Sequence, residues 1–271
     1  MKILFIEPKP YFERLIDVSA LEKEFKVTYG IPCFVYSLVS FLKVYDVVIT
    51  CIEHSTLSRN TIKVSKDLGI KTALIMDGTY EFTNSTCNPY LKKIDFELLK
   101  SSQFSIVFSP DLMMKKYIEN LGARYCFYLP KHARLQNNNE EVLMEKVLIT
   151  TANSAYFNSE ELYRLVELIK LVVETLKDQG IEYKFRIFDE QLISKLEIPD
   201  LQNEIRDDIS TCISNFSHII TTPSTIVYTA IRAKKPTALL IYRDSPITQP
   251  AGWLFFVGLN IKNSMRRFLG E

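Results

Sequence analysis

A hydroxyl-rich turn between a short apolar strand and a helix is the most promising place for chemistry in this sequence. Thr222, Pro223, Ser224 and Thr225 form that turn. We predict Thr222 as the helix N-cap, with Pro223 in the first helical turn, where its missing N–H costs nothing. Free amides and the positive end of a helix dipole favour an anion there. The turn therefore predicts a phosphate site, although a plain helix cap would have the same sequence.

A second polar loop is expected at the same edge of the sheet. It follows the predicted strand Lys146–Thr150 and begins with Thr151, Ala152 and Asn153. The carboxyl ends of parallel strands lie at one edge of a sheet, so Thr151 and Asn153 should join the hydroxyl-rich turn in one anion pocket.

An acid follows a strand in the first half of the chain. Asp77 and Gly78 come directly after the apolar run Thr72–Met76. We predict Asp77 as a general base on a tight turn; an Asp-Gly pair also commonly bonds its own backbone. Glu81 is an alternative acid near the same strand end.

Three cationic side chains follow a later strand of the same half. Lys131, His132 and Arg134 fall within four residues, and we predict that Lys131 and His132 contact a leaving phosphate. His54 also follows a strand and could line the same edge, although it could equally lead into a helix capped by Ser55.

The elements that must position these groups alternate between strands and helices. The predicted strands are Ile3–Ile6, Lys26–Tyr29, Asp46–Cys51, Thr72–Met76, Phe104–Phe108, Arg124–Tyr128, Lys146–Thr150 and Tyr183–Phe188, followed by the Ser217–Tyr242 strand, helix and strand. These runs show little polar alternation, which is typical of strands buried on both faces of a parallel sheet. The predicted helices are Ser55–Leu68, Pro110–Leu121, Glu160 to about Gln179, and Ile205–Asn215.

The pattern restarts after a polar stretch, Gln136–Glu141, which we interpret as a linker. The fold class is therefore predicted to be α/β, with two Rossmann-like doubly wound parallel-sheet domains facing a central cleft. We predict an acceptor-side domain over residues 1–135 and a nucleotide-binding domain over residues 136–271.

Composition limits the class of protein. The 271 residues are 47% hydrophobic and carry a net charge of +1, which gives no general attraction to nucleic acid. Five scattered cysteines without paired spacing indicate a reducing, cytoplasmic setting and no disulfide framework or zinc site. No apolar run reaches the length of a membrane span.

The motifs resemble those of two-Rossmann (GT-B type) glycosyltransferases of bacterial surface polysaccharides, especially the sialyl- and Kdo-transferases that use CMP-activated sugars. Met76-Asp77-Gly78 resembles the acidic motif, Pro130-Lys131-His132 is similar to the His-Pro motif in a rearranged form, and Thr222–Thr225 resembles the Ser/Thr pair that opens a late helix. The resemblance implies Asp77 as general base, His132 as the group that binds or protonates the leaving phosphate, and Ser224 and Thr225 as its cradle.

Two departures bear on mechanism and donor. A single acid precedes Gly78 where that family often has two, and Pro130 precedes the basic pair, so inversion or retention at the sugar stays open. UDP- and GDP-sugar transferases commonly carry an acid in the late helix; Ile226–Ala230 has none, which favours a cytidine monophosphate donor. With no Asp-x-Asp motif, neither a metal nor another cofactor is predicted.

The predicted partners are a nucleotide sugar and a glycan or lipid-linked acceptor, and no nucleic acid. The aromatic and arginine-rich segment from Gly252 to Leu269 could touch the cytoplasmic face of a membrane, or it could fold back to brace the two halves. Two alternatives remain open: a UDP-sugar transferase or epimerase on the same architecture, and a non-catalytic subunit that binds glycan or a partner enzyme.

Overall fold

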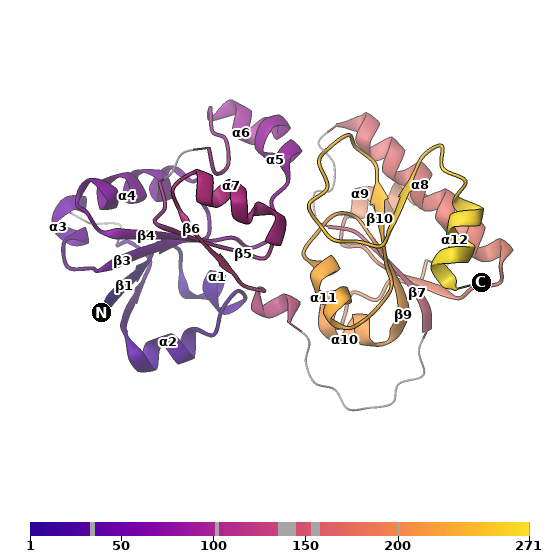
Figure 1. Ribbon diagram of the computed structural model, residues 1–271, viewed down its shortest axis with the longest axis horizontal. Coiled ribbons are helices and arrows are strands. Elements are labelled where there is room, and N and C mark those ends of the chain that lie inside the picture. The colour runs from indigo at the N-terminus through magenta and orange to yellow at the C-terminus, as the bar shows by residue number, and fades with distance from the viewer. Residues whose placement is uncertain (33–35, 101–102, 135–144, 153–157, 200, 271) are drawn as a thin grey trace. The chain divides into compact units, whose positions relative to one another are not determined.

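The computed structural model describes residues 1–32, 36–100, 103–134, 145–152, 158–199 and 201–270 (Figure 1). Contacts within the chain divide it into two compact units, Met1–His132 and Ala133–Glu271, here called unit 1 and unit 2. The predicted linker Gln136–Glu141 lies outside the described residues, as does Asn153 of the predicted anion pocket.

The described part of unit 1 is built on a six-stranded parallel sheet in the order β2-β1-β3-β4-β5-β6. Its strands are β1 (Lys2–Phe5), β2 (Lys26–Tyr29), β3 (Val47–Thr50), β4 (Lys71–Ile75), β5 (Ile106–Ser109) and β6 (Arg124–Phe127). The chain winds outward from β1 in both directions, so the strand order reverses between β1 and β3. Such a reversal leaves a crevice at the carboxyl ends of the two strands.

Helices cover both faces of the unit 1 sheet. They are α1 (Lys9–Glu13), α2 (Val18–Glu24), α3 (Leu38–Leu42), α4 (Thr56–Asp67), α5 (Phe82–Cys87), α6 (Pro89–Lys93) and α7 (Lys115–Asn120), with 3-10 turns η1 (Leu112–Met114) and η2 (Lys131–Ala133). Phe12 of α1 packs with Phe5 in one core, whereas Ile62 of α4 and Ile118 of α7 pack with Leu4 in another. Alternate side chains of β1 thus enter opposite cores, which explains its unbroken apolar run.

The described part of unit 2 repeats this plan with a five-stranded parallel sheet in the order β11-β10-β9-β7-β8. Its strands are β7 (Glu145–Thr150), β8 (Tyr183–Arg186), β9 (Phe216–Thr221), β10 (Thr237–Ile241) and β11 (Trp253–Phe256). Its helices are α8 (Ser159–Asp178), α9 (Glu190–Leu196), α10 (Ile209–Ser214), α11 (Ile226–Arg232) and α12 (Ile261–Leu269). Here the strand order reverses between β7 and β9.

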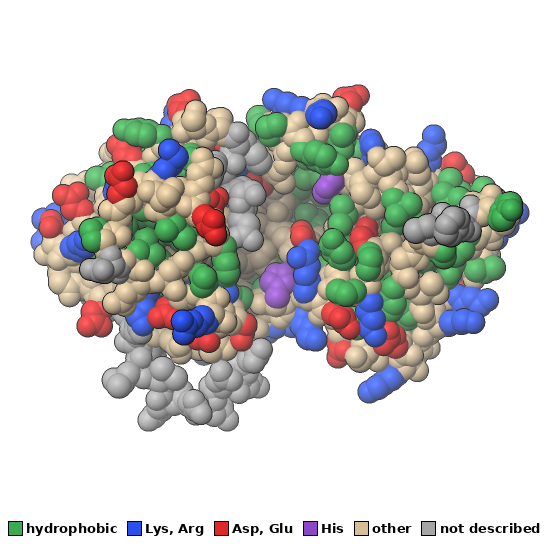
Figure 2. All heavy atoms as spheres, turned by 180° about the vertical axis from the view of Figure 1, so that it is seen from behind, with side chains coloured by type: hydrophobic (Ala, Val, Ile, Leu, Met, Phe, Trp, Pro, Cys, Tyr) green, Lys and Arg blue, Asp and Glu red, His purple; other side chains and the backbone are tan. Residues whose placement is uncertain are grey.

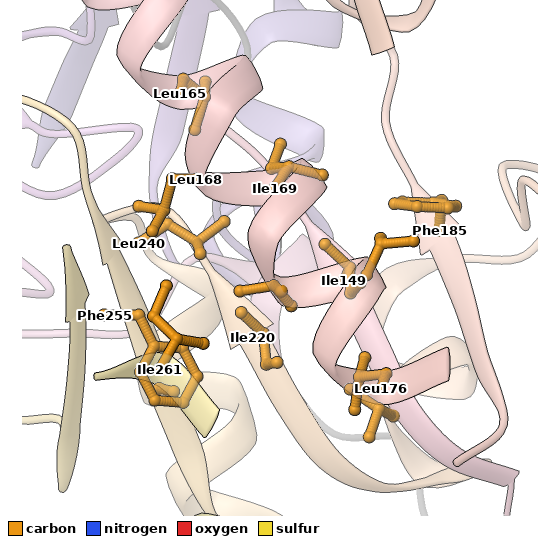
Figure 3. Packing of buried hydrophobic residues seen from close by; sticks show 14 of the residues in the cluster. Ile149, Leu165, Leu168, Ile169, Leu176, Phe185, Ile220, Leu240, Phe255 and Ile261 are labelled. Carbon is orange, nitrogen blue, oxygen red and sulfur yellow. The ribbon is translucent and has the colours of Figure 1, made fainter. Parts of the chain in front are cut away.

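The larger core of unit 2 lies under α8 (Figure 3). Leu165, Ile169 and Leu176 of this helix are fully buried against Ile149 and Ile220 of the sheet. Burying a side chain of this size contributes about 1.5–3 kcal/mol relative to leaving it exposed. The helix predicted from Glu160 to about Gln179 is confirmed, and these apolar residues serve packing.

The predicted fold class is confirmed in its two Rossmann-like parallel-sheet units. The helix ends predicted at Leu68, Leu121 and about Gln179 are also correct. The glycines that follow them, Gly69, Gly122 and Gly180, adopt positive φ angles of 72°, 83° and 65°. That left-handed conformation is open to glycine at little steric cost.

One predicted helix boundary is wrong. The helix predicted from Ile205 begins at Ile209, because the Asp208 carboxylate accepts hydrogen bonds from Ser210 N (2.9 Å) and Thr211 N (3.1 Å) and caps it there. The polar Thr83–Pro89 stretch forms most of α5 and the start of α6. The C-terminal segment supplies β11 and α12 to the core of unit 2.

Candidate functional site

A buried carboxylate, Glu7, lies at the carboxyl ends of β1 and β3 in unit 1, with only 7% of its surface exposed. Its Oε1 accepts hydrogen bonds from Thr50 Oγ1 (2.5 Å) and Ser58 Oγ (3.0 Å), and its Oε2 accepts one from Cys51 N (3.0 Å). A buried charge is tolerated when several donors surround it. Glu7 therefore fixes the loop that leaves β3 and carries the next two titratable groups, Glu53 and His54.

Cys51 is held beside this carboxylate, with its Sγ 3.7 Å from Glu7 Oε2. Burial raises the pKa of the Cys51 thiol, and the charge of Glu7 adds to the effect. A thiol in this state is a poor nucleophile, so Cys51 serves packing and hydrogen bonding.

Glu53 is the strongest acid–base candidate in the described residues. Burial raises the pKa of its carboxyl group to about 7, against an opposing hydrogen bond from Leu99 N to Oε2 at 3.2 Å. A carboxyl group with a pKa near neutrality can accept and return a proton at physiological pH. Sequence reasoning missed this residue.

The adjacent His54 lies in the same loop, with its ring edge-on to Tyr90 at 5.7 Å between centroids. Burial lowers the pKa of His54, the Asp77 carboxylate opposes this shift, and the Arg59 guanidinium reinforces it. His54 therefore lies within electrostatic range of Asp77, as expected for groups at the ends of the neighbouring strands β3 and β4.

Asp77 forms an exposed ion pair with Arg14, whose Nη2 lies 3.2 Å from Asp77 Oδ2. The side chains are 60% and 51% exposed, so the pair adds little to stability and both groups are open to a ligand. Arg14 follows α1, the first helix after β1, and sequence reasoning did not select it.

His132 reaches the same arginine through the backbone. Its amide N donates to Arg14 O at 3.1 Å, and its ring Nδ1 lies 3.1 Å from that oxygen. A carbonyl only accepts, so Nδ1 carries the proton and Nε2 is the nitrogen left for a ligand. Lys131 N donates to Leu15 O at 2.7 Å. The structure thus brings two predicted residues to Arg14, Asp77 to its guanidinium group and His132 to its backbone oxygen.

The remaining predicted groups of this region have less defined roles. Gly78 follows Asp77 in a bend, and the partly buried Glu81 occupies the N-cap position of α5 without a side-chain cap hydrogen bond. Arg134 is exposed and lies in unit 2, beyond the unit boundary at His132. Roles for these three residues stay predictions.

In unit 2, Thr222 bridges the corresponding crevice between β7 and β9. Its Oγ1 accepts a hydrogen bond from Ala152 N at 2.7 Å, and it lies beside the buried Thr151. The prediction that Thr222 caps the late helix is wrong, because this bond to the neighbouring strand end engages its hydroxyl group. Thr225 occupies the N-cap position instead, without a side-chain cap hydrogen bond.

Ser224 has a buried Oγ that forms no hydrogen bond with the described residues. The same is true of Ser245 Oγ and Thr248 Oγ1, in the loop after the neighbouring strand β10. Buried hydroxyls normally have a partner, so unpaired ones at the carboxyl end of a sheet are natural contacts for a ligand. Ser245 and Thr248 carry no local sequence signal that could have identified them.

A buried ion pair supports the same edge of unit 2. Arg243, at the end of β10, places its Nε 3.1 Å from Oε1 of Glu161, in the first turn of α8, and the side chains are 6% and 13% exposed. The pair joins the start of α8 to the β10 strand end.

Neither a metal centre nor a membrane span is found in the part of the chain that the structure describes. It contains no group of three His, Cys, Asp or Glu side chains arranged to hold a metal, and none of its helices is long and apolar enough to cross a bilayer. Basic and acidic side chains are interspersed on the face seen in Figure 2. That face offers no continuous basic stripe of the kind that binds nucleic acid.

No protein-family model matches the sequence, and no curated protein matches it. Solved structures match it over the whole chain. The UDP-GlcNAc 2-epimerase of Methanocaldococcus jannaschii, in complex with UDP-GlcNAc and UDP, is 16% identical with a TM-score of 0.61, over 100% of this chain and 93% of that one.

Two further structures show the same likeness. The UDP-GlcNAc 2-epimerase of Neisseria meningitidis, bound to UDP-GlcNAc, is 14% identical with a TM-score of 0.56, over 99% of this chain and 90% of that one. The glycotransferase of kitacinnamycin is 11% identical with a TM-score of 0.55, over 100% of this chain and 90% of that one. At these identities the likeness establishes the fold, which is of the GT-B type.

Proposed function

We propose that this protein is an enzyme that acts on a nucleotide sugar, with epimerisation of a UDP-sugar as the reaction to test first. The observation that carries the proposal is the pair of carboxyl groups, Glu53 and Asp77, at adjacent strand ends of unit 1. Two similar folds belong to UDP-GlcNAc 2-epimerases, which supports this choice over a CMP-sugar transferase.

The two acids suit proton transfer at a sugar carbon. Epimerisation of a carbon that bears hydrogen breaks the C–H bond, and a proton must return to the opposite face of the same carbon. Asp77, exposed and paired with Arg14, would act as the base in its carboxylate form. Glu53, whose pKa is raised to about 7, would supply the returning proton. Asp77 would then release the proton that it took from carbon, and this proton would pass through solvent to Glu53.

The nucleotide is assigned to the carboxyl edge of the unit 2 sheet. Ser224, Ser245 and Thr248 offer unpaired buried hydroxyls there. Thr222 and Thr151 lie at the ends of β9 and β7, where the hydroxyl group of Thr222 accepts the N–H of Ala152. Thr225 and Asn153, which the sequence predicted as phosphate-binding residues, also belong to this proposed site. In unit 1 by itself, Arg14, Lys131 and His132 are cationic groups proposed to bind phosphate oxygens. No metal is required in this scheme.

Proton exchange tests the reaction directly. UDP-GlcNAc incubated with the enzyme in D₂O should incorporate deuterium at one sugar carbon, which NMR detects. Asp77→Asn and Glu53→Gln should each slow this exchange at least about 100-fold, the typical contribution of a general acid or base. Glu119→Gln, an exposed acid on α7, should exchange at the wild-type rate. Wild-type exchange in either active-site variant would overturn the assignment of roles.

A thermal-shift panel separates the nucleotide classes. Saturating UDP should raise the melting temperature, and Ser224→Ala should reduce that increase. A larger shift with CMP than with UDP would restore the CMP-sugar donor favoured by the acid-free Ile226–Ala230 segment. No shift with UDP, CMP, GDP or CDP would refute nucleotide recognition altogether.

Sugar transfer to a glycan or lipid-linked acceptor is the second candidate, supported by the glycotransferase of the same fold. In that reaction Asp77 would deprotonate the acceptor hydroxyl, and His132 would contact the leaving phosphate through Nε2. Release of free nucleotide that depends on an added acceptor, without deuterium exchange, would favour transfer. Contact with a membrane surface belongs to this candidate and would bring the enzyme to a lipid-linked acceptor.

A further inference from the structure

A groove lies on the face of unit 2 where α8 and α9 pack side by side. It has a volume of about 670 Å³ and is lined by Asn158, Ser159, Leu162, Tyr163, Val166, Lys170, Gln191, Lys195 and Glu197. We call this set the α8/α9 groove. Its α8 side runs from Asn158 to Lys170, which at 1.5 Å per residue is a length of about 18 Å. A volume of this size is within the range of small-molecule sites.

The walls combine apolar and polar chemistry. Leu162 and Val166 are buried at 4% and 8% exposure, whereas the neighbouring Tyr163 is 67% exposed. Asn158 Oδ1 accepts the N–H of Glu161 at 2.9 Å, which leaves its amide hydrogens as donors. An exposed aromatic ring beside amide and hydroxyl groups fits a ligand with one C–H face and a hydroxylated edge, as a sugar ring has.

The charges of the groove select the kind of sugar. Lys170 Nζ lies 3.3 Å from Glu197 Oε2, in an ion pair whose side chains are 43% and 78% exposed. Lys195 has no ion pair within the described part of the chain and lines the same groove. The lining side chains therefore carry a net charge of +1, from two lysines and one glutamate, and their one unpaired charge is positive.

We propose that the α8/α9 groove binds an acidic oligosaccharide, with Tyr163 stacked on a sugar ring and Lys195 paired with a sugar carboxylate. This would add a glycan-binding surface to an enzyme of nucleotide sugars, and it does not depend on nucleotide binding. The groove offers no strand edge for an extended peptide, since helices form its two long sides.

Calorimetry with the whole chain tests the proposal. The probes are a hyaluronan tetrasaccharide, which is acidic, and chitotetraose, which is neutral, each without nucleotide. We expect the acidic probe to bind at least 10-fold more tightly. Tyr163→Ala and Lys195→Gln should each weaken that binding at least 10-fold, and the effect of Lys195→Gln should shrink at high salt.

Two exposed residues outside the groove provide matched controls. Tyr36→Ala and Lys177→Gln remove the same side chains elsewhere and should leave the affinity unchanged. Equal binding of the two probes would refute the selection of an acidic sugar. No binding of hyaluronan, or unchanged binding by both groove variants, would refute the site. The nucleotide thermal-shift panel uses different ligands, so its failure would be distinguishable from this one.

Discussion

Glu53 gives a prediction about how stability depends on pH, which differs between a buried carboxyl group with a raised pKa and an ordinary surface glutamate. Its pKa is raised from 4.5 to about 7 by burial, so the folded protein holds this proton more tightly than the unfolded chain does. Between these two pKa values the native state binds more protons, and the free energy of unfolding falls as pH rises. At 1.36 kcal/mol per pKa unit, the loss of stability reaches about 3 kcal/mol above pH 7.

The substitution Glu53→Gln removes this dependence, because glutamine resembles the protonated acid at every pH. We expect the variant to be more stable than the wild type by about 2–3 kcal/mol at pH 8.5, and by less than about 1 kcal/mol at pH 5. At about 2–4 °C per kcal/mol, the melting temperature at pH 8.5 should rise by about 5–10 °C.

The assay must report on unit 1. Trp253 is the single tryptophan and lies in unit 2, so its fluorescence is unsuitable if the units unfold separately. Hydrogen exchange of β3 and β4 at the two pH values measures the local free energy of unfolding instead. Glu119→Gln should change it by less than about 0.5 kcal/mol at either pH. Equal effects of Glu53→Gln at pH 5 and pH 8.5 would refute a raised pKa at this site.

Three further changes test the contacts that define the two crevices. Glu7→Leu leaves the donors of Thr50 and Cys51 without an acceptor and should destabilise unit 1 by about 2–6 kcal/mol, as measured by urea denaturation. Glu7→Gln should cause a smaller loss. A change below about 0.5 kcal/mol for Glu7→Leu would contradict the buried network. Thr222→Val should lower the stability of unit 2 by about 1–3 kcal/mol, because Ala152 N loses its acceptor. Thr222→Ser keeps the hydroxyl group and should retain most of that stability. Equal losses in the two variants would mean that the methyl group matters more than the hydroxyl group. Glu161→Gln should lower the free energy of unfolding by up to about 3–5 kcal/mol, because it leaves Arg243 buried without its charge partner. Adding Arg243→Met should recover part of this loss. If the effects of the two substitutions simply add, the two residues do not interact.

The alternation of strands and helices could be predicted because its signals are local. Apolar runs such as Ile3–Ile6 indicate strands buried on both faces, and Gly69 and Gly122 mark helix ends through a backbone conformation that other residues adopt at a cost. One error arose from a contact elsewhere in the chain, because the Thr222 hydroxyl group accepts a hydrogen bond from Ala152 N, 70 residues away, and does not cap the late helix. The other was a missed local cap. Asp208 outcompetes the residues before it as a cap and shortens α10.

The sequence by itself determined the fold class and the strand ends that bear polar residues, and it indicated Asp77 as a candidate general base and His132 as a candidate phosphate-binding group. Only the tertiary structure decided which of these groups meet. Glu7 bonds Thr50 across 43 residues and Thr222 bonds Ala152 across 70, because the strand order of a doubly wound sheet reverses at those points. Burial and long-range pairing also set the pKa of Glu53 and bring Arg14 to Asp77, and neither effect has a local signature.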